Sequence, residues 1–366
     1  MTAASVEPGP HPRHTATAGV VGVSVLGVLL VAGLAWAKWV PYAGKIGALS
    51  GTHAWPGGAI FASSGNPGAA PTFAGAWHFT VAYFQSIWPA LVVALVVAAA
   101  VDALVPRAWL GMAMNRRTRF GQAAAAGTAA LPSMMCTCCT APVAVGLRRC
   151  GVTTAASLAY WIGNPLLNPA VLAFLFLVGP WQLGTVRIVV GAALVFAAAP
   201  VIARLFGPGD EDRPRPDLPD GPGRARPEPI AVADLPARYA RSLARFAVML
   251  VPEYVAAVAL IGWLSGWLSS FDSLDAKLGV LAVVVVAVIG TLLVIPTGGE
   301  IPVVLALAAA GASAGTVGAL LITLPALSIP SIIMVGRALS WRVTAATAAA
   351  VAVAGLLAGL LLWTLA

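Results

Sequence analysis

The sequence predicts an all-α polytopic membrane protein made of two inverted repeats, each with a re-entrant or broken helical hairpin. Of the 366 residues, 60% are hydrophobic and only 9% are charged, whereas about a quarter of the residues in a soluble domain are charged. Apolar stretches of more than about 18 residues, the length that crosses a bilayer core, recur along the chain. Two of these stretches are interrupted by proline and glycine. The pattern predicts about seven full spans plus two hairpins.

The N-terminal part is expected to contain one transmembrane helix between two polar segments. Residues 1–17 form a polar tail that ends in Arg13 and His14, just before an apolar run. This order is also typical of signal sequences, but a retained first helix over 18–39 is the favoured interpretation. Residues 40–76 are rich in Gly, Pro and Ser and nearly free of charge, which predicts an external loop.

The first repeat is expected over residues 77–206. Its hairpin, 121–147, is apolar and alanine-rich, contains prolines, and has arginines on both sides. If the hairpin is re-entrant, both groups of arginines stay on the cytoplasmic side, where positive charge accumulates. The full spans of this repeat are expected at 79–101, 152–178 and 183–206.

A linker separates this repeat from the next. Residues 207–237 contain eight prolines and seven of the thirteen acidic residues, which predicts a disordered cytoplasmic segment. The second repeat follows over 238–366. Its spans are expected at 246–270, 316–336 and 343–365, and its broken stretch at 278–310.

The two repeats are related by a constant offset of 160 residues. With both broken stretches as hairpins, seventeen of the twenty-one basic residues lie on the cytoplasmic side. The repeats then have opposite orientations, and inverted repeats with broken helices are typical of secondary transporters. The matched pairs are Pro142 with Pro302, Gly151 with Gly311, Pro165 with Pro325 and Asn168 with Ser328. The basic residues expected at or near the outside are Lys38, Lys45, Arg187 and Lys277.

The first chemical motif lies at the expected tip of the first hairpin. Cys136, Cys138, Cys139 and Thr140 follow one another there, and the bends are assigned to Pro132 and Pro142. Thiolates are soft ligands that select soft metal ions such as Cu(I), and by the same logic trivalent arsenic. The three cysteines are therefore predicted metal ligands, and Thr140 a substrate contact. The alternative is that the cysteines are small buried apolar side chains.

The second motif lies in the break of the second repeat, between Pro296 and Pro302. It contains Thr297 and Glu300, which we expect to contact substrate. An ionisable side chain inside a membrane is costly and marks a functional site by default. Glu300 is therefore also the predicted proton-coupling residue. A structural bond to exposed backbone amides is the alternative.

A third motif interrupts the span at 152–178 and recurs in the second repeat. Proline removes a helix hydrogen bond, and nearby polar side chains can satisfy the freed backbone groups or bind a substrate. The predicted substrate contacts here are Asn164, Asn168 and Ser328, and the structural breaks are Pro165, Pro169 and Pro325. Arg187 needs a partner or interfacial water, and the sequence does not identify which.

Two segments carry a family resemblance. The stretch Pro132–Pro169, with its Cys-Thr-Cys-Cys and Asn-Pro-Leu-Leu-Asn-Pro motifs, resembles the predicted-permease family that includes the organoarsenical efflux permeases. Pro296–Arg342 resembles the second repeat of that family. The resemblance implies a multi-pass permease of the bacterial inner membrane, and in its arsenic members an exporter of trivalent organoarsenicals. It also implies that Cys136, Cys138 and Cys139 are candidate ligands.

These observations predict a secondary permease that exports a small thiophilic solute by alternating access. The chain has no phosphate-binding GxxxxGK[ST] loop, so we expect that it does not hydrolyse ATP. Its basic residues are interpreted as marking the cytoplasmic side of a membrane protein, so we expect no nucleic-acid partner, and we also expect no enzyme and no cofactor. The expected partners are the lipid bilayer and a small-molecule or metalloid substrate, and a homo-oligomer is left open. One alternative is a permease for an unrelated small anion or sulfur compound, with Arg187 supplying positive potential. Another is a membrane thiol-disulfide electron relay, although the second repeat has no cysteine.

Overall fold

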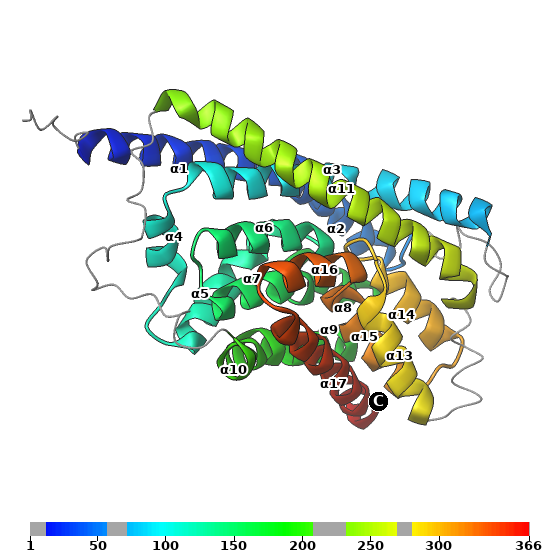
Figure 1. Ribbon diagram of the computed structural model, residues 1–366. Coiled ribbons are helices and arrows are strands. Elements are labelled where there is room, and N and C mark those ends of the chain that lie inside the picture. Colours follow the sequence, from blue (N-terminus) through cyan, green and yellow to red (C-terminus); the bar gives the residue numbers. More distant parts are fainter. Residues whose placement is uncertain (1–11, 57–71, 208–231, 269–279, 366) are drawn as a thin grey trace, which may run out of the picture.

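The computed structural model describes residues 12–56, 72–207, 232–268 and 280–365, and within these residues all regular elements are helices (Figure 1). Among the described residues, six helices are long and apolar enough to cross a membrane. The pair α15 and α16, bent by 50°, is a seventh candidate that forms either a broken span or a re-entrant loop. Two shorter apolar helices, 281–292 and 300–309, are too short to cross alone. The predicted fold class, an all-α polytopic membrane protein, is confirmed.

The N-terminal helix is longer than the sequence predicts. Helix α1 (Pro12–Leu34) continues through a π-helical turn, η1 (Ala35–Trp39), into α2 (Val40–Thr52). The loop predicted over 40–76 is therefore wrong for its first third, and the helix begins inside the predicted polar tail. Glycines lower the helix propensity of α2, but tertiary packing overrides propensity. One such packing contact is that of the Tyr42 ring, which lies edge-on against the ring of Phe174 with the two centroids 5.7 Å apart.

The first repeat begins with a long helix and continues with shorter ones. The long helix α3 (Phe73–Leu104) starts at a Thr72 N-cap and is followed by α4 (Arg107–Met114) and α5 (Arg119–Ala130). The remaining elements are η3 (Leu131–Ser133), α6 (Thr137–Arg149), α7 (Thr154–Leu166), α8 (Pro169–Val178), α9 (Trp181–Ala192), η4 (Ala193–Ala198) and α10 (Ala199–Phe206).

The described helices of the second half begin at the end of the linker. Most of the predicted linker lies outside the described residues, but its C-terminal end is helical and not disordered. This part forms η6 (Val232–Asp234) and the start of α11 (Leu235–Leu268), which packs along α3. The elements that follow are α13 (Val280–Leu292), α14 (Glu300–Ala309), α15 (Ala314–Ala326), α16 (Ile329–Ala338) and α17 (Trp341–Leu365).

The helix boundaries follow the 160-residue offset. Helices α7 and α15 correspond at both ends, as do α8 and α16, and α9 and α17 start at equivalent tryptophans. The turns after α6 and α14 also agree, because Gly151 has φ of +87° and Gly311 φ of +84°. These left-handed conformations favour glycine. The offset in the sequence therefore corresponds to two structural units with matching helices.

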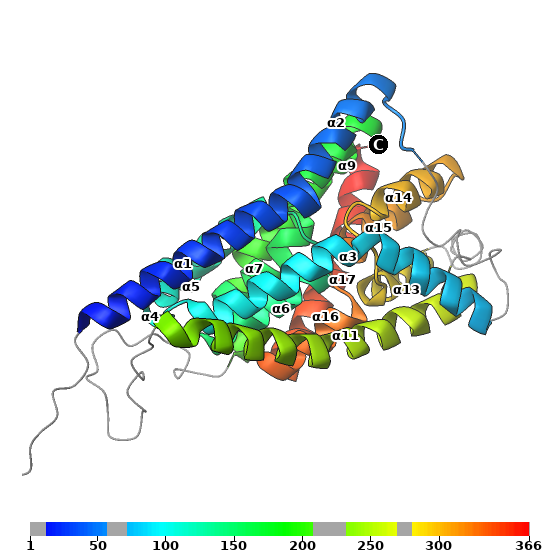
Figure 2. The ribbon, with the colours of Figure 1, turned by 90° about the horizontal axis from the view of Figure 1, so that it is seen from above.

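Helices α3 and α11, which correspond in the two units, run antiparallel along one side of the molecule (Figures 1 and 2). The hydroxyl of Ser242, near the start of α11, donates to Asp102 Oδ2, near the end of α3, at 2.7 Å. At the opposite end, the rings of Phe73 and Trp263 stack at 6.4 Å. These two helices therefore point in opposite directions.

Candidate functional site

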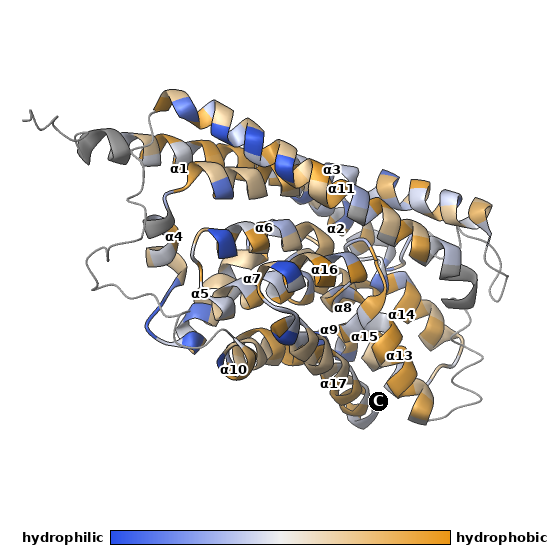
Figure 3. Ribbon diagram, viewed as in Figure 1, coloured by the Kyte–Doolittle hydropathy of each residue, from blue (hydrophilic) through white to orange (hydrophobic). Residues whose placement is uncertain are grey.

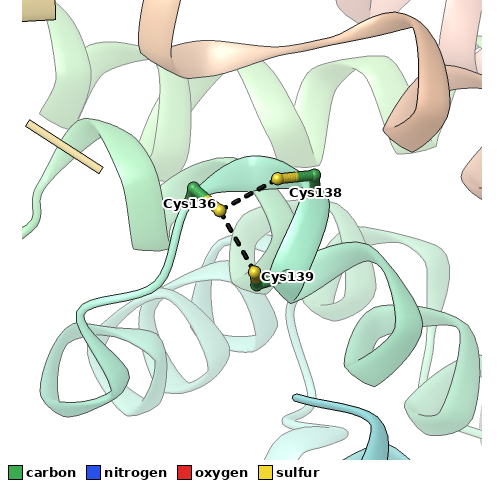
Figure 4. Close-up of side chains that lie close together, drawn as sticks. All are labelled: Cys136, Cys138 and Cys139. Carbon is green, nitrogen blue, oxygen red and sulfur yellow. Dashed lines mark hydrogen bonds between the residues drawn. The ribbon is translucent and has the colours of Figure 1, made fainter. Parts of the chain in front are cut away.

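The three clustered cysteines converge at the start of α6 (Figure 4). Cys136 is the N-cap residue, and Cys138 and Cys139 lie in the first turn. The Sγ atom of Cys136 lies 2.9 Å from that of Cys138 and 3.2 Å from that of Cys139. All three side chains are buried free thiols, and their sulfurs lie within 4.8 Å of one another. This arrangement can hold one soft metal or metalloid centre.

The bend that precedes this helix start is held by side chains from other helices. After η3 the chain turns through Met134, which has φ of +48°. Asn164, from α7, accepts from the Met135 N–H at 2.8 Å and donates to the Ser133 hydroxyl. Trp39 Nε1 donates to the Pro132 carbonyl at 2.7 Å. Asn164 therefore positions the cysteines, a role that was not part of its prediction as a substrate contact.

The structure corrects the role assigned to Pro142. It lies inside α6, which continues to Arg149, so the break of this hairpin is at residues 131–136 and not at Pro142. The helix continues because a proline near its start removes only one hydrogen bond, the one to the Cys138 carbonyl. Among the other predicted breaks, Pro165 and Pro325 lie inside α7 and α15 near their ends, Pro132 and Pro169 lie at helix starts, and Pro296 and Pro302 flank the start of α14.

Thr140 is fully buried and bonded to backbone. Its hydroxyl lies 2.9 Å from the Thr137 carbonyl and 3.3 Å from the Trp161 carbonyl of α7. The threonine therefore ties α6 to α7. It directly follows Cys139 in α6, and its hydroxyl faces the interface with α7.

Two tyrosines close the sulfur cluster from α3 and α11, and sequence reasoning missed both. Tyr254 donates from its hydroxyl to Cys138 Sγ at 2.7 Å. The hydroxyl of Tyr83 lies 3.1 Å from that of Tyr254 and 3.7 Å from Cys138 Sγ. Each is a phenol within a largely apolar helix, and a buried phenol needs a hydrogen-bond partner. This signal was available in the sequence.

A buried lysine from the N-terminal helix lies beside the cluster. The side chain of Lys38 is only 7% exposed, and its neighbour Trp39 bonds to the Pro132 carbonyl in the bend that precedes the cysteines. Lys38 Nζ donates to the Tyr42 hydroxyl at 2.9 Å and to Thr297 Oγ1 at 3.1 Å. The sequence did not predict these contacts, and the placement of Lys38 at or near the outside of the membrane stays a prediction. Lys38 belongs to the π-helical turn, a distortion common at functional sites.

The second break carries an ion pair. Glu300, the first residue of α14, accepts from Arg187 Nη2 at 2.8 Å, and both side chains are buried. Arg187, on α9, also donates to the carbonyls of Pro165 at 2.8 Å and Leu166 at 3.1 Å, at the C-terminal end of α7. The guanidinium is thus covered by α7, α14 and α15, and these groups are the partner that the sequence left unidentified. Glu300 and Arg187 join the broken ends of the two repeats.

Asn168 and Ser328, which correspond in the repeats, both lie at helix starts. Asn168 Oδ1 accepts from the Ala170 N–H of α8 at 3.1 Å. The N–H of Ser328 donates to Ser331 Oγ at 3.1 Å, and the same oxygen accepts from the Thr137 hydroxyl at 3.3 Å. The start of α16 therefore meets the start of α6.

The two predicted substrate contacts of the second break lie in different surroundings. Thr297 accepts a hydrogen bond from Lys38, whereas Glu300 pairs with Arg187.

Comparison with known proteins agrees with this architecture. A model of the predicted permease family ArsP_1 matches residues 72–363. The chain is 34% identical over 334 residues to the UPF0718 protein YraQ of Escherichia coli strain K12, covering 91% of this chain and 92% of that protein. No solved structure matches. The chain belongs to the predicted permease family, and it is a multi-pass transporter of the bacterial inner membrane.

Proposed function

We propose that this permease is a secondary transporter that exports a small thiophilic solute, a trivalent organoarsenical or a soft metal ion. The observation that carries the proposal is the convergence of three buried cysteine sulfurs within 4.8 Å. Sulfur ligands select soft centres. Cys136 is the central ligand because its sulfur is near both of the others.

Alternating access is supported by the way both repeats contribute to the site. The cysteines and Tyr83 come from the first repeat, Tyr254 from the second, and Tyr254 bonds to Cys138. The antiparallel course of α3 and α11 supports inverted repeats, in which one bundle rocks against the other around a fixed site. We infer that separation of α11 from α6 breaks the bond between Tyr254 and Cys138 and opens the site.

Proton coupling is assigned to Glu300. Protonation of its carboxylate removes the charge that pairs with Arg187. Helix α14 is then released from the ends of α7 and α9, and the two repeats can move relative to each other. Glu300→Gln should therefore transport with little dependence on the proton gradient. Unchanged dependence in this variant would contradict the assignment.

The test of substrate binding is uptake into everted membrane vesicles. The solutes are a trivalent methylarsenical, arsenite, antimonite and Cu(I), each offered to wild type and to a variant with Cys136, Cys138 and Cys139 changed to Ser. The matched control is Cys150→Ser, because Cys150 is a fourth buried thiol, bonded to the Val101 carbonyl at the far end of α6. The proposal expects loss of uptake in the triple variant alone. Equal uptake by all three proteins would overturn it.

The small-anion permease is less well supported. In that alternative Arg187 supplies positive potential to an anion, but its guanidinium already pairs with Glu300. The electron relay predicts a different chemistry, since its thiols must cycle between dithiol and disulfide. Labelling with a thiol reagent during transport distinguishes it, because a ligand site keeps all three thiols reduced.

A further inference from the structure

A second polar site lies at the other end of the helices that form the sulfur cluster. A cavity of about 530 Å³ lies between α6, α11 and α16. Four arginines line it: Arg148 and Arg149 from α6, Arg245 from α11 and Arg337 from α16. Among the described residues that line the cavity, none is acidic. Arginine keeps its charge at all physiological pH values, so the cavity is lined by four permanently charged groups of the same sign.

The arginines gather at one end of the bundle. Figure 3 shows hydrophilic residues at the ends of α6 and α16 and along the first half of α11. Three of the four arginines are in the last turns of α6 and α16, where a positive charge also stabilises the helix dipole. Helix stabilisation does not explain Arg245, which lies in the body of α11, nor the common cavity.

The cavity leads toward the sulfur cluster along the same helices. On α6, Val145 of the cavity wall is seven residues from Cys138, about 10 Å along the axis. On α11, Leu250 is four residues from Tyr254, about 6 Å. Helix α16 likewise leads from the cavity to Ser331, which contacts the start of α6. Along the helices, the cavity is therefore about two turns from Cys138 and about one turn from Tyr254.

We propose that this arginine-lined cavity is the cytoplasmic entrance of the transport path, and that it binds the cargo as an anionic complex with a small carboxylate-bearing thiol. The inference rests on the proposed function. The concentration of arginine assigns this end to the cytoplasm. Clefts lined by one sign of charge raise the local concentration of ligands of the opposite sign, and carboxylates are bound well by guanidinium groups.

The transfer from carrier to protein is a ligand exchange. In a reducing cytoplasm, a thiophilic centre is held by thiols. A cysteine sulfur of the cluster forms a bond to the centre, the bond from the centre to the carrier sulfur breaks, and the cysteine proton leaves on the carrier thiol. No electron is transferred. The exchange takes place at the cluster, and the carrier thiol leaves through the arginine-lined cavity after the centre has bonded to the cysteine.

The experiment compares an anionic and an uncharged complex of one probe. Phenylarsine oxide is offered to everted vesicles as its glutathione complex or as its 2-mercaptoethanol complex. The variant combines Arg149→Gln, Arg245→Gln and Arg337→Gln, one exposed arginine from each helix. Arg241→Gln is the control, because Arg241 is on α11, bonds to the Ala237 carbonyl at 3.2 Å and is not among the residues lining the cavity.

The proposal predicts that the triple arginine variant lowers the initial rate for the glutathione complex about tenfold at low concentration, and for the uncharged complex less than about twofold. The rate of wild type with the glutathione complex should also fall with added salt. Equal losses for both complexes would overturn the proposal and indicate a structural role or a phospholipid headgroup. No loss for either would overturn it as well. Uptake of the uncharged complex by wild type, absent in the triple cysteine variant, tests the proposed function separately.

Discussion

The two breaks occupy equivalent positions in the repeats but carry different chemistry. In the first, the start of α6 has three thiols and Thr137, which donates to a serine of α16. In the second, the start of α14 has Glu300 paired with Arg187, and Thr297 bonded to Lys38. The backbone is repeated while the side chains have diverged. We infer that the first break binds the cargo and that the second controls how the repeats move.

The largest expected effect comes from the ion pair of the second break. Arg187→Gln should destabilise the protein by about 3–5 kcal/mol, because it leaves the buried Glu300 carboxylate without its partner. Thermal unfolding in detergent measures this. Arg187→Gln combined with Glu300→Gln should lose much less stability than the two single variants together. Additive losses would show that the two side chains do not act as a pair.

The next effect concerns the tyrosine at the first break. Tyr254→Phe keeps the ring but removes the hydroxyl that donates to Cys138, and groups that bond to metal ligands contribute about 10–100-fold to affinity. Binding of phenylarsine oxide, measured by protection of the thiols from maleimide, should weaken within this range. Tyr239→Phe, on the same helix and partly buried, should bind as wild type does. Equal binding by both variants would remove Tyr254 from the site.

Thr137 and Thr297 correspond under the 160-residue offset, and their substitution compares the hydrogen bonds of the two breaks. Thr297→Val removes an acceptor from the Lys38 ammonium and should cost about 1.5 kcal/mol or more, because hydrogen bonds to charged groups are the stronger ones. Thr137→Val removes a bond between two neutral hydroxyls and should cost about 1 kcal/mol. Unfolding of the two variants in parallel measures the difference. A larger loss at Thr137 would contradict the assignment of charge to the second break.

The smallest expected effect tests what the two units share. Gly151 and Gly311 have φ of +87° and +84°, and a Cβ at either would meet no atom within 4 Å. Replacing either glycine by Ala should therefore destabilise the protein only because Ala disfavours the left-handed conformation. The expected loss is about 1–2 kcal/mol, and it should be the same at both positions. Clearly unequal losses in unfolding experiments would show that the turns are not equivalent.

The sequence predicted well what depends on nearby residues. The three cysteines lie within four positions, so their proximity followed from the chain itself. The 160-residue offset identified two units whose helix boundaries agree. Local composition failed at α2, because packing against Phe174 overrides the glycines. The break predicted from composition at Pro142 is also wrong, because α6 continues through this proline to Arg149.

The rest of the site depends on contacts between distant segments. Glu300 was expected to couple protons and Arg187 to need a partner or interfacial water, but nothing local pairs residues from two repeats. Nothing local predicted the contacts of Lys38 either, because its π-helical turn lies against both breaks. Tyr83 and Tyr254 meet because α3 and α11 are antiparallel. An isolated polar side chain in an apolar helix was the one local sign of these residues.

X-ray absorption at the arsenic edge tests the central claim most directly. The sample is the purified protein in lipid nanodiscs, loaded with one equivalent of phenylarsine oxide. We predict arsenic bonded to sulfur in wild type and in Cys150→Ser, and no bonded sulfur when Cys136, Cys138 and Cys139 are all Ser. Sulfur ligation that persists in the triple variant, or oxygen ligation alone in wild type, would contradict the assignment of the cluster as the cargo site.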